Sequence, residues 1–513
     1  MNVKWFLGAG LIVLVLAVPS TAAPPPNVVL ILADDLGWSD LSCCGSTFYE
    51  TPAIDRLAAQ GMRFDQAYAA ANVCSPTRAS IMTGKYPARL HTTNFFGGNR
   101  RGKLLPPPYR QYLPPEEISL AKAFGQAGYR TWFGGKWHLG GQGSQPTDHG
   151  FQMATGLDTR PGRGPDDDPH FSARLSTEAA EFIEQSAERP FFLYLPLHSV
   201  HVPLRTRPEL QKKYEVKAAA QPPKTPREVP VKDFMARAVQ DHPVYAGMVQ
   251  EMDEAVGRVL RKLDEMKLAE RTVVVFTSDN GGLCTAEGSP TSNLPLRAGK
   301  GWNYQGGIRV PLIVRLPGRI PADSTCDEPV ISIDLYPTLL ALAGVDVLAA
   351  QKVDGVSIVP LLERTGRIAA RPLFWHYPHY SNQGGRPGGA VRVGQYGLVE
   401  FFEDEHVELY DLAADGGEER DLAVDQPQRA AEMRRLLAEW RRSVDAQMPT
   451  VNPNPVDPFG PGAVDRPQTK KTNKAKRKVQ AGGNPSHACS TTTSTAATSR
   501  QQPRSCPTTT RDG

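Results

Sequence analysis

The segment Cys74-Ser75-Pro76-Thr77-Arg78 holds a potential covalent nucleophile, a cysteine, with a cation four residues further along the chain. The C-x-P-x-R pattern carries little information alone, because a chain of this composition can contain it by chance. Its value depends on which other reactive side chains accompany it. Of the seven cysteines in the sequence, only Cys74 has neighbours that indicate chemistry.

Acidic and amide side chains follow two apolar, β-branched runs. Asp34 and Asp35 come directly after the first run, and Asp279 and Asn280 come directly after another. Ligands of open α/β sheets collect at the carboxyl ends of strands, so we expect these four side chains to meet. Their oxygen atoms suit Ca²⁺ or Mg²⁺. Taken singly, each pair could equally be a tight turn.

Two lysines and three histidines are further candidates. Lys136 and His138 lie two residues apart in GKWHLG and would share one face of an extended segment. His198 and His201 in HSVHVP follow an apolar run, and Lys300 lies in the glycine-rich RAGKG. Each of these could instead be an ordinary surface lysine or packed histidine.

The elements that would position these residues alternate along the chain. Apolar runs typical of strands buried in a parallel sheet occupy residues 27–33, 191–197, 272–278 and 310–314, and a shorter run occupies 129–133. Helical patterns occupy residues 51–60, 116–126, 176–188 and 242–266. Strands that alternate with helices predict a layered α/β domain.

After residue 362 the pattern changes to short alternating segments. Residues 390–393, 396–403 and 406–410 predict a small antiparallel sheet, and residues 428–444 predict an amphipathic helix over one of its faces. We therefore expect a main domain at residues 27–365 and a smaller α+β domain at 366–448. No internal repeat is evident.

The N-terminus has the pattern of a cleavable secretory signal at residues 1–23. Lys4 precedes an apolar run at residues 7–18 and then small residues, and the run is too short to predict stable membrane insertion. The prediction is export to the periplasm or beyond.

The basic character of the chain belongs to its C-terminal end. The net charge is +4, but residues 449–513 hold ten Lys and Arg against three Asp and Glu, which leaves −3 for the rest. Residues 449–513 are predicted to be a disordered, solvated tail, with contact to an anionic surface as the alternative. Seven cysteines predict no dense disulfide framework, although Cys489 and Cys506 could pair. We expect no nucleic-acid partner.

Eight motifs in a fixed order carry a resemblance to a known family. They are ADDLGWSDL, TPAIDRLAAQGMRF, CSPTRASIMTG, GKWHLG, HSVHVPL, TSDNGG, LRAGKGWNYQGGIRVP and ELYDL, between about residues 27 and 412. Together they resemble type I sulfatases of the alkaline phosphatase superfamily, in particular bacterial arylsulfatase-like enzymes. The resemblance implies a three-layer α/β/α sandwich as the catalytic domain and a smaller C-terminal α+β domain with a short antiparallel sheet.

The resemblance also implies a modified nucleophile. In this family the motif cysteine, here Cys74, is oxidised to Cα-formylglycine by a formylglycine-generating enzyme. Thr77 stands where serine is commoner in the family. One divalent ion, Ca²⁺ rather than Mg²⁺, would be bound by Asp34, Asp35, Asp279, Asn280 and the modified residue 74.

Further roles follow from the same resemblance. Arg78 would hold the nucleophile, Lys136 and Lys300 would bind sulfate oxygens, His138 would contact the hydrated formylglycine, and His201 would protonate the departing alcohol. His198 is a weaker candidate for that last role.

The implied activity is hydrolysis of sulfate monoesters, aryl sulfates in an assay and carbohydrate sulfates in nature. Residues 94–112, 161–170 and 377–389 are candidate specificity loops. Two alternatives stay open: a phosphonate or phosphate monoester hydrolase of the same superfamily, and a catalytically silent glycan-binding protein.

Overall fold

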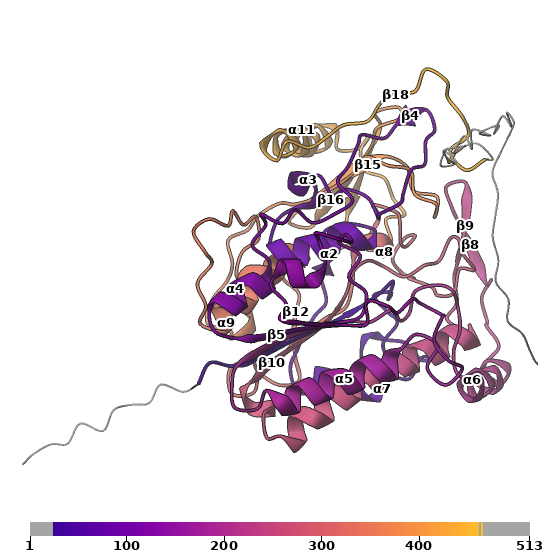
Figure 1. Ribbon diagram of the computed structural model, residues 1–513. Coiled ribbons are helices and arrows are strands. Elements are labelled where there is room, and N and C mark those ends of the chain that lie inside the picture. Colours follow the sequence, from indigo (N-terminus) through magenta and orange to yellow (C-terminus); the bar gives the residue numbers. More distant parts are fainter. Residues whose placement is uncertain (1–23, 461–462, 465–513) are drawn as a thin grey trace, which may run out of the picture. The chain divides into compact units, whose positions relative to one another are not determined.

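A mostly parallel eight-stranded sheet lies at the centre of the fold (Figure 1). The structure is a computed structural model that describes residues 24–460 and 463–464. In sheet order the strands are β12 (Ser324–Cys326), β2 (Met62–Phe64), β11 (Leu312–Arg315), β10 (Thr272–Ser278), β1 (Asn27–Ala33), β7 (Phe191–Pro196), β5 (Arg130–Gly134) and β6 (Met153–Thr155). Strands β1 and β10 lie side by side in parallel, with Ala33 opposite Ser278.

Helices cover both faces of this sheet (Figure 1). On one face lie α2 (Cys74–Thr83), α4 (Leu120–Gln126) and α9 (Leu335–Leu342), and on the other lie α1 (Pro52–Ala59), α5 (Ser172–Gln185) and α7 (Pro243–Glu265). A hydrophobic core lies on each face of the sheet, and alternate residues of β1 pack into each. Val28 and Leu30 pack into the first core and Val29 and Ile31 into the second. The continuous apolar run was therefore a correct sign of a strand buried on both faces, and the predicted α/β/α sandwich is confirmed.

One predicted strand runs against the expected direction. The run at residues 310–314 was grouped with the parallel strands, but β11 is antiparallel to both β10 and β2. A parallel return needs a crossover element that spans the sheet, usually a helix. The connection after β10 contains only the four-residue α8 (Gln305–Ile308), so the chain turns back beside β10.

A second, antiparallel sheet follows, as predicted, and it has four strands rather than the three predicted. Its strands are β14 (Leu373–Tyr377), β15 (Gly388–Val393), β16 (Tyr396–Phe401) and β17 (Val407–Asp411), and α11 (Pro427–Ser443) packs on it. Strand β14 was not predicted. All five of its residues are buried, so it lacks the polar alternation that marked the other three strands.

The remaining elements are short or peripheral. They are η1 (Ser42–Cys44), β3 (Ala67–Tyr68), α3 (Pro87–Leu90), β4 (Leu104–Leu105), η2 (Pro146–His149), α6 (Pro208–Ala220), β8 (Glu228–Val231), β9 (Phe234–Arg237), η3 (Ala269–Arg271), β13 (Val330–Ile331), η4 (Ser332–Asp334), α10 (Val359–Leu362) and β18 (Thr450–Val451).

Residues 450–452, near the start of the predicted disordered tail, are ordered. Strand β18 pairs with β4, and Asn452 is buried with its side-chain amide donating to the Gly102 carbonyl at 2.8 Å. These residues are ordered because they complete a two-stranded ladder, which a composition argument cannot detect. The basic part of the tail, the Cys489 and Cys506 pair and the predicted signal at 1–23 lie outside the described residues.

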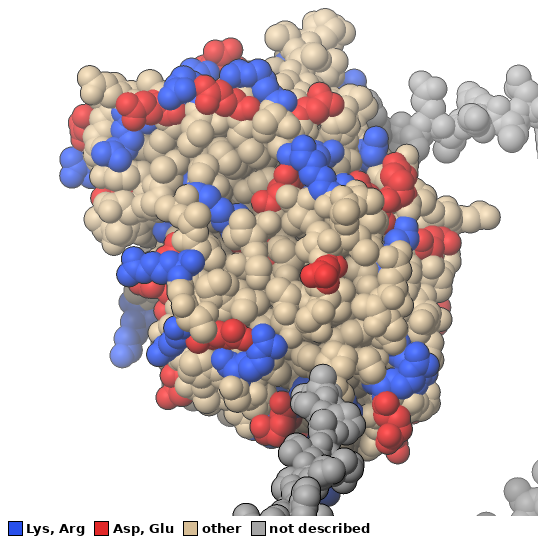
Figure 2. All heavy atoms as spheres, turned by 90° about the vertical axis from the view of Figure 1, so that its left-hand side faces the viewer, with Lys and Arg blue, Asp and Glu red and all other residues tan. Residues whose placement is uncertain are grey.

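Within residues 24–460 and 463–464, no helix has the length and apolarity needed to cross a bilayer. Over the same part of the chain, Cys43, Cys44, Cys74, Cys284 and Cys326 are free thiols. On the face seen in Figure 2, acidic and basic side chains are interspersed, with broad uncharged areas between them.

Candidate active site

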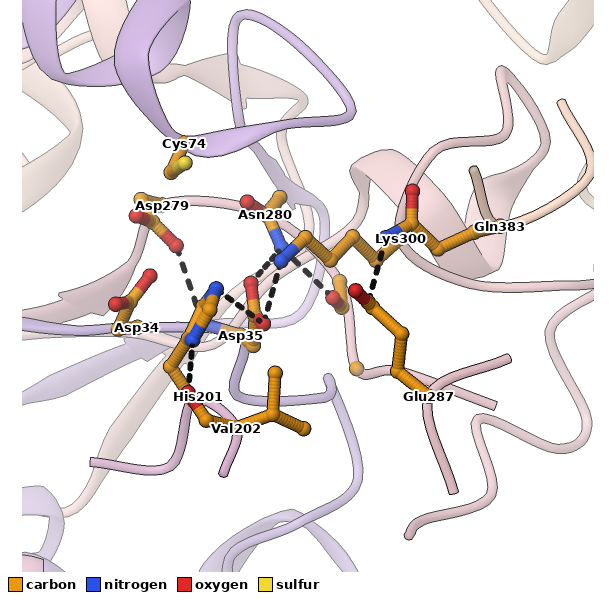
Figure 3. A network of polar contacts seen from close by, with 12 residues as sticks. Asp34, Asp35, Cys74, His201, Val202, Asp279, Asn280, Glu287, Lys300 and Gln383 are labelled. Atoms are coloured by element: carbon orange, nitrogen blue, oxygen red, sulfur yellow. Dashed lines mark hydrogen bonds and ion pairs between the residues drawn. The ribbon is translucent and has the colours of Figure 1, made fainter. Parts of the chain in front are cut away.

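The four predicted oxygen ligands meet where β1 and β10 end. Asp34 and Asp35 leave β1 while Asp279 and Asn280 leave β10, and the parallel pairing of the two strands places both pairs at one edge of the sheet. The backbone N–H of Asp35 donates to Asp279 Oδ1 at 3.2 Å, and the Asn280 side-chain amide donates to Asp35 Oδ1 at 2.9 Å. Figure 3 shows the four side chains together.

Cys74 lies above these carboxylates as the first residue of α2. It is 2% exposed, and its Sγ and carboxylate oxygens of Asp34 and Asp279 all lie within 4.8 Å of one another. The Sγ also lies 3.2 Å from His138 Nδ1. The sequence did not predict helix α2. Its start at Cys74 sets the reactive side chain at a helix N-terminus, where the helix dipole favours negative charge.

Arg78 lies one turn after Cys74 on the same helix face and ties α2 to both strand ends. Its Nε and Nη2 lie 2.8 Å and 2.7 Å from Asp279 Oδ2, and its Nη2 lies 3.4 Å from Asp34 Oδ1. Burial lowers the pKa of Arg78, but Asp279 and Asp34 more than compensate and raise it. The guanidinium is therefore a permanent buried cation.

The two lysines converge on the same centre. Lys136 Nζ lies 2.5 Å from Asp34 Oδ2, and Lys300 Nζ lies 2.7 Å from Asp35 Oδ2. Burial raises the pKa of Asp34 and of Asp35, but the neighbouring cations outweigh it and hold both below their usual range. Asp34 and Asp35 are therefore carboxylates at neutral pH.

The histidines differ in what they face. His201 Nδ1 donates to the Val202 carbonyl at 2.6 Å, which leaves Nε2 directed at Asp35 Oδ2, 3.6 Å away. His198 instead contacts the Thr159 hydroxyl at 2.7 Å, and burial with the charge of Lys136 lowers its pKa to about 3. His198 is therefore a neutral side chain in the cavity wall, held by Thr159.

The oxygen cluster fits a divalent cation. Two of its fully buried oxygens accept no hydrogen bond: Asn280 Oδ1, and Asp34 Oδ1, which makes the 3.4 Å ion pair with Arg78. Burial, then the charge of Asp34, raises the pKa of Asp279 well above its usual range. Buried unsatisfied oxygens are costly, and a hard cation would satisfy both.

A cavity of about 770 Å³ opens over Cys74, Lys136, His138, His201 and Lys300. The three predicted specificity loops contribute Phe95, Phe96, Gln111, Pro161, Asn382 and Gln383 to its wall. The sequence analysis missed three other contributors: residues 140–146, residues 156–160 and Glu287. The glycines and turn-forming residues around these positions indicate loops. No pattern in the sequence indicates that these loops lie near residue 74.

Comparisons with known proteins define the class. A family model described as Sulfatase matches residues 26–345, and one described as N-sulphoglucosamine sulphohydrolase, C-terminal, matches residues 298–444. The chain belongs to the sulfatase family, and it is an enzyme of sulfate ester hydrolysis.

Particular relatives cover most of the chain. A "Sulfatase" of Formosa agariphila is 31% identical over 509 residues, covering 81% of this chain and 88% of that protein. An "N-acetylgalactosamine-6-sulfatase" of Canis lupus familiaris is 33% identical over 411 residues, covering 73% and 72%. The crystal structure of "Ps i-CgsB in complex with k-i-k-neocarrahexaose" has a TM-score of 0.67 and 28% identity, covering 82% and 94%.

Proposed function

We propose that this enzyme hydrolyses carbohydrate sulfate monoesters by means of Cα-formylglycine at position 74 and one Ca²⁺ ion. The observation that carries the proposal is the convergence of Cys74, two lysines and two histidines in one cavity, over three buried carboxylates. Export by the predicted N-terminal signal would bring the enzyme to extracellular substrates.

Asp34, Asp35, Asp279, Asn280 and residue 74 would bind the Ca²⁺ ion. When bound, the metal would screen the negative charge of the sulfate group. The hydrated aldehyde would supply the oxygen nucleophile. The unsatisfied oxygens of Asp34 and Asn280 support this assignment.

The cations of the site would bind and orient the sulfate. A sulfate monoester is an anion, so its charge must be balanced before a nucleophile can approach sulfur. Lys136 and Lys300 line the cavity and would donate to the sulfate oxygens. Arg78 is fully buried below them and would fix residue 74 through its ion pairs with Asp279 and Asp34.

The two histidines would move protons at defined atoms. Burial, with Lys136 and Arg78, lowers the pKa of His138 to about 3, so its Nδ1, 3.2 Å from Cys74 Sγ, is free to accept a proton from residue 74. His201 would donate from Nε2 to the departing oxygen, since Nδ1 is held by Val202. Burial lowers the pKa of His201, and a bound sulfate ester would raise it by placing an anion nearby.

The substrate class rests on the relatives and on the site. One relative is an N-acetylgalactosamine-6-sulfatase, and a structural neighbour, Ps i-CgsB, was solved in complex with k-i-k-neocarrahexaose. The cavity of about 770 Å³ is large enough for a sugar residue with its sulfate.

Turnover of matched aryl esters tests the reaction. We expect 4-nitrophenyl sulfate to be hydrolysed with a kcat/KM at least about tenfold above that for 4-nitrophenyl phosphate, because the lysines here balance a monoanion. The measurement is release of nitrophenolate from both esters. Faster hydrolysis of the phosphate, or of a phosphonate monoester, would show that the protein is a phosphonate or phosphate monoester hydrolase of the superfamily instead.

His201→Ala should separate substrates by their leaving group. A nitrophenolate departs without a proton, whereas a sugar alkoxide needs one. We therefore expect the variant to lose about 100-fold or more in kcat on a hexose sulfate and less than about tenfold on 4-nitrophenyl sulfate. His406→Ala, an exposed imidazole on the second sheet, is the matched control. An equal loss of kcat on both substrates would show that His201 is not the proton donor.

A further inference from the structure

A carboxylate lies in the wall of the active-site cavity. Among the described residues that line it, Glu287 is the only Asp or Glu, and Lys136, Lys300 and Arg160 line the same space. A carboxylate facing an anionic substrate opposes binding by Coulomb repulsion. Its place in the wall of a sulfate-ester cavity therefore calls for a function other than binding of the sulfate.

Glu287 is held in one orientation by two amides from the loop after β14. Asn382 Nδ2 donates to its Oε1 at 3.0 Å. Gln383 Nε2 donates to its Oε2 at 2.8 Å (Figure 3). Each carboxylate oxygen receives one N–H and keeps further acceptor capacity. The two amides therefore orient the carboxylate but leave hydrogen-bond acceptor sites free on both of its oxygens.

The loop that provides the clamp is itself anchored. The Gln383 backbone carbonyl accepts hydrogen bonds from Thr285 Oγ1 at 2.7 Å and from Trp302 Nε1 at 2.8 Å. Thr285 precedes Glu287 by two residues. The loop that holds Glu287 and the loop that holds Asn382 and Gln383 are therefore joined by the Thr285 hydrogen bond as well as by the two hydrogen bonds to the Glu287 carboxylate. This arrangement preorganises Glu287, which lowers the cost of binding a partner.

The backbone at this position is strained. Glu287 has φ 53° and Ser289 has φ 41°, on either side of Gly288 at φ 92°. Left-handed conformations cost a residue with a Cβ about 1 kcal/mol, and such strain concentrates at ligand-binding segments. The turn thus places Glu287 at the cavity despite a local energetic cost.

We infer that Glu287 forms a recognition subsite for hydroxyl groups of the sugar that carries the sulfate. The free acceptor sites of its oxygens suit neutral hydroxyl donors. A second sulfate or a carboxylate would be repelled by Glu287. Hydroxyl groups are the hydrogen-bond donors that a singly sulfated sugar presents to such a carboxylate. The inference rests on the proposed function and specifies its substrate: a sulfated sugar with free hydroxyls at this wall.

The test is Glu287→Gln, which keeps the shape and an acceptor but removes the charge. We expect the ratio of kcat/KM for galactose 6-sulfate to that for 4-nitrophenyl sulfate to fall about tenfold, because a hydrogen bond to a charged acceptor is about twice as strong as a neutral one. The variant should discriminate less against a disulfated galactose. Glu181→Gln, which removes an exposed carboxylate from α5 outside the cavity, should leave the ratio unchanged.

Binding separates failure of the subsite from failure of the proposed function. In Cys74→Ala protein, which cannot turn over substrate by the proposed route, calorimetry should show weaker galactose 6-sulfate binding when Glu287→Gln is added. An unchanged substrate ratio together with unchanged binding overturns the subsite. If the wild type hydrolyses no sulfate ester and the Cys74→Ala protein binds none, the proposed function fails, and the inference fails with it.

Discussion

Cys74→Ala is expected to abolish hydrolysis of 4-nitrophenyl sulfate, lowering kcat by at least about 1,000-fold. The alanine side chain can neither be oxidised to an aldehyde nor donate an oxygen to sulfur, while Lys136 and Lys300, which line the cavity, would still bind the sulfate. The loss should therefore lie in kcat rather than in KM. Nitrophenolate release measures the rate, and thermal unfolding should show a Tm within a few degrees of the wild type, since the substitution removes only one heavy atom from the side chain.

A buried thiol outside the site provides the matched control. Cys284 is 1% exposed, and burial raises its pKa to about 12, so it is an inert packing residue. Cys284→Ala should keep its activity per folded molecule. Mass spectrometry of the tryptic peptide spanning residues 64–78 should find an aldehyde at position 74 in active protein from the native host. Active protein in which every copy of this peptide carries an unmodified cysteine would refute the nucleophile assignment.

Removal of calcium is expected to produce the second large effect, a loss of activity together with a lower Tm. Without the ion, three buried carboxylates and an unsatisfied amide oxygen remain together. A ligand present at 100 times its Kd and bound only by the folded state stabilises it by about 2.7 kcal/mol. Calorimetric scans after chelation and after return of Ca²⁺ should differ by several degrees, and activity should return with the ion.

Two variants test whether this effect belongs to the proposed ligands. Asn280→Ala removes one oxygen that accepts no hydrogen bond in the protein, so it should raise the Ca²⁺ concentration needed for activity. Asp404→Asn removes an exposed carboxylate between β16 and β17 and should leave the calcium dependence unchanged. Full activity in protein shown by elemental analysis to be metal-free would contradict the metal site.

Local pattern was enough to predict the central layers and the residues at their edge. The runs that became β1 and β10 are apolar on both faces, and the acidic pairs stand immediately after them. Because parallel strands end at one edge, the meeting of Asp34 with Asp279 followed from sequence order alone. The motifs then indicated the family, which the comparisons confirmed.

The errors share a cause, which is dependence on partners distant in sequence. Strand β11 is antiparallel because no long helix separates it from β10, and β14 is buried on both sides by residues from elsewhere. Thr450 and Val451 become a strand only because Leu104 and Leu105 present an edge. A single-sequence pattern contains no information about such partners.

The sequence by itself determined the chemistry of this protein: a cysteine, carboxylates, lysines and histidines in the order typical of one enzyme family. Only the tertiary structure decided how they are used. It directed His201 at the Asp35 carboxylate and His198 at the Thr159 hydroxyl. It also brought Glu287 to Asn382 and Gln383, about a hundred residues further along the chain. The physical reason is that residue types follow from the chain itself, whereas distances and burial exist only after strands and loops pack together.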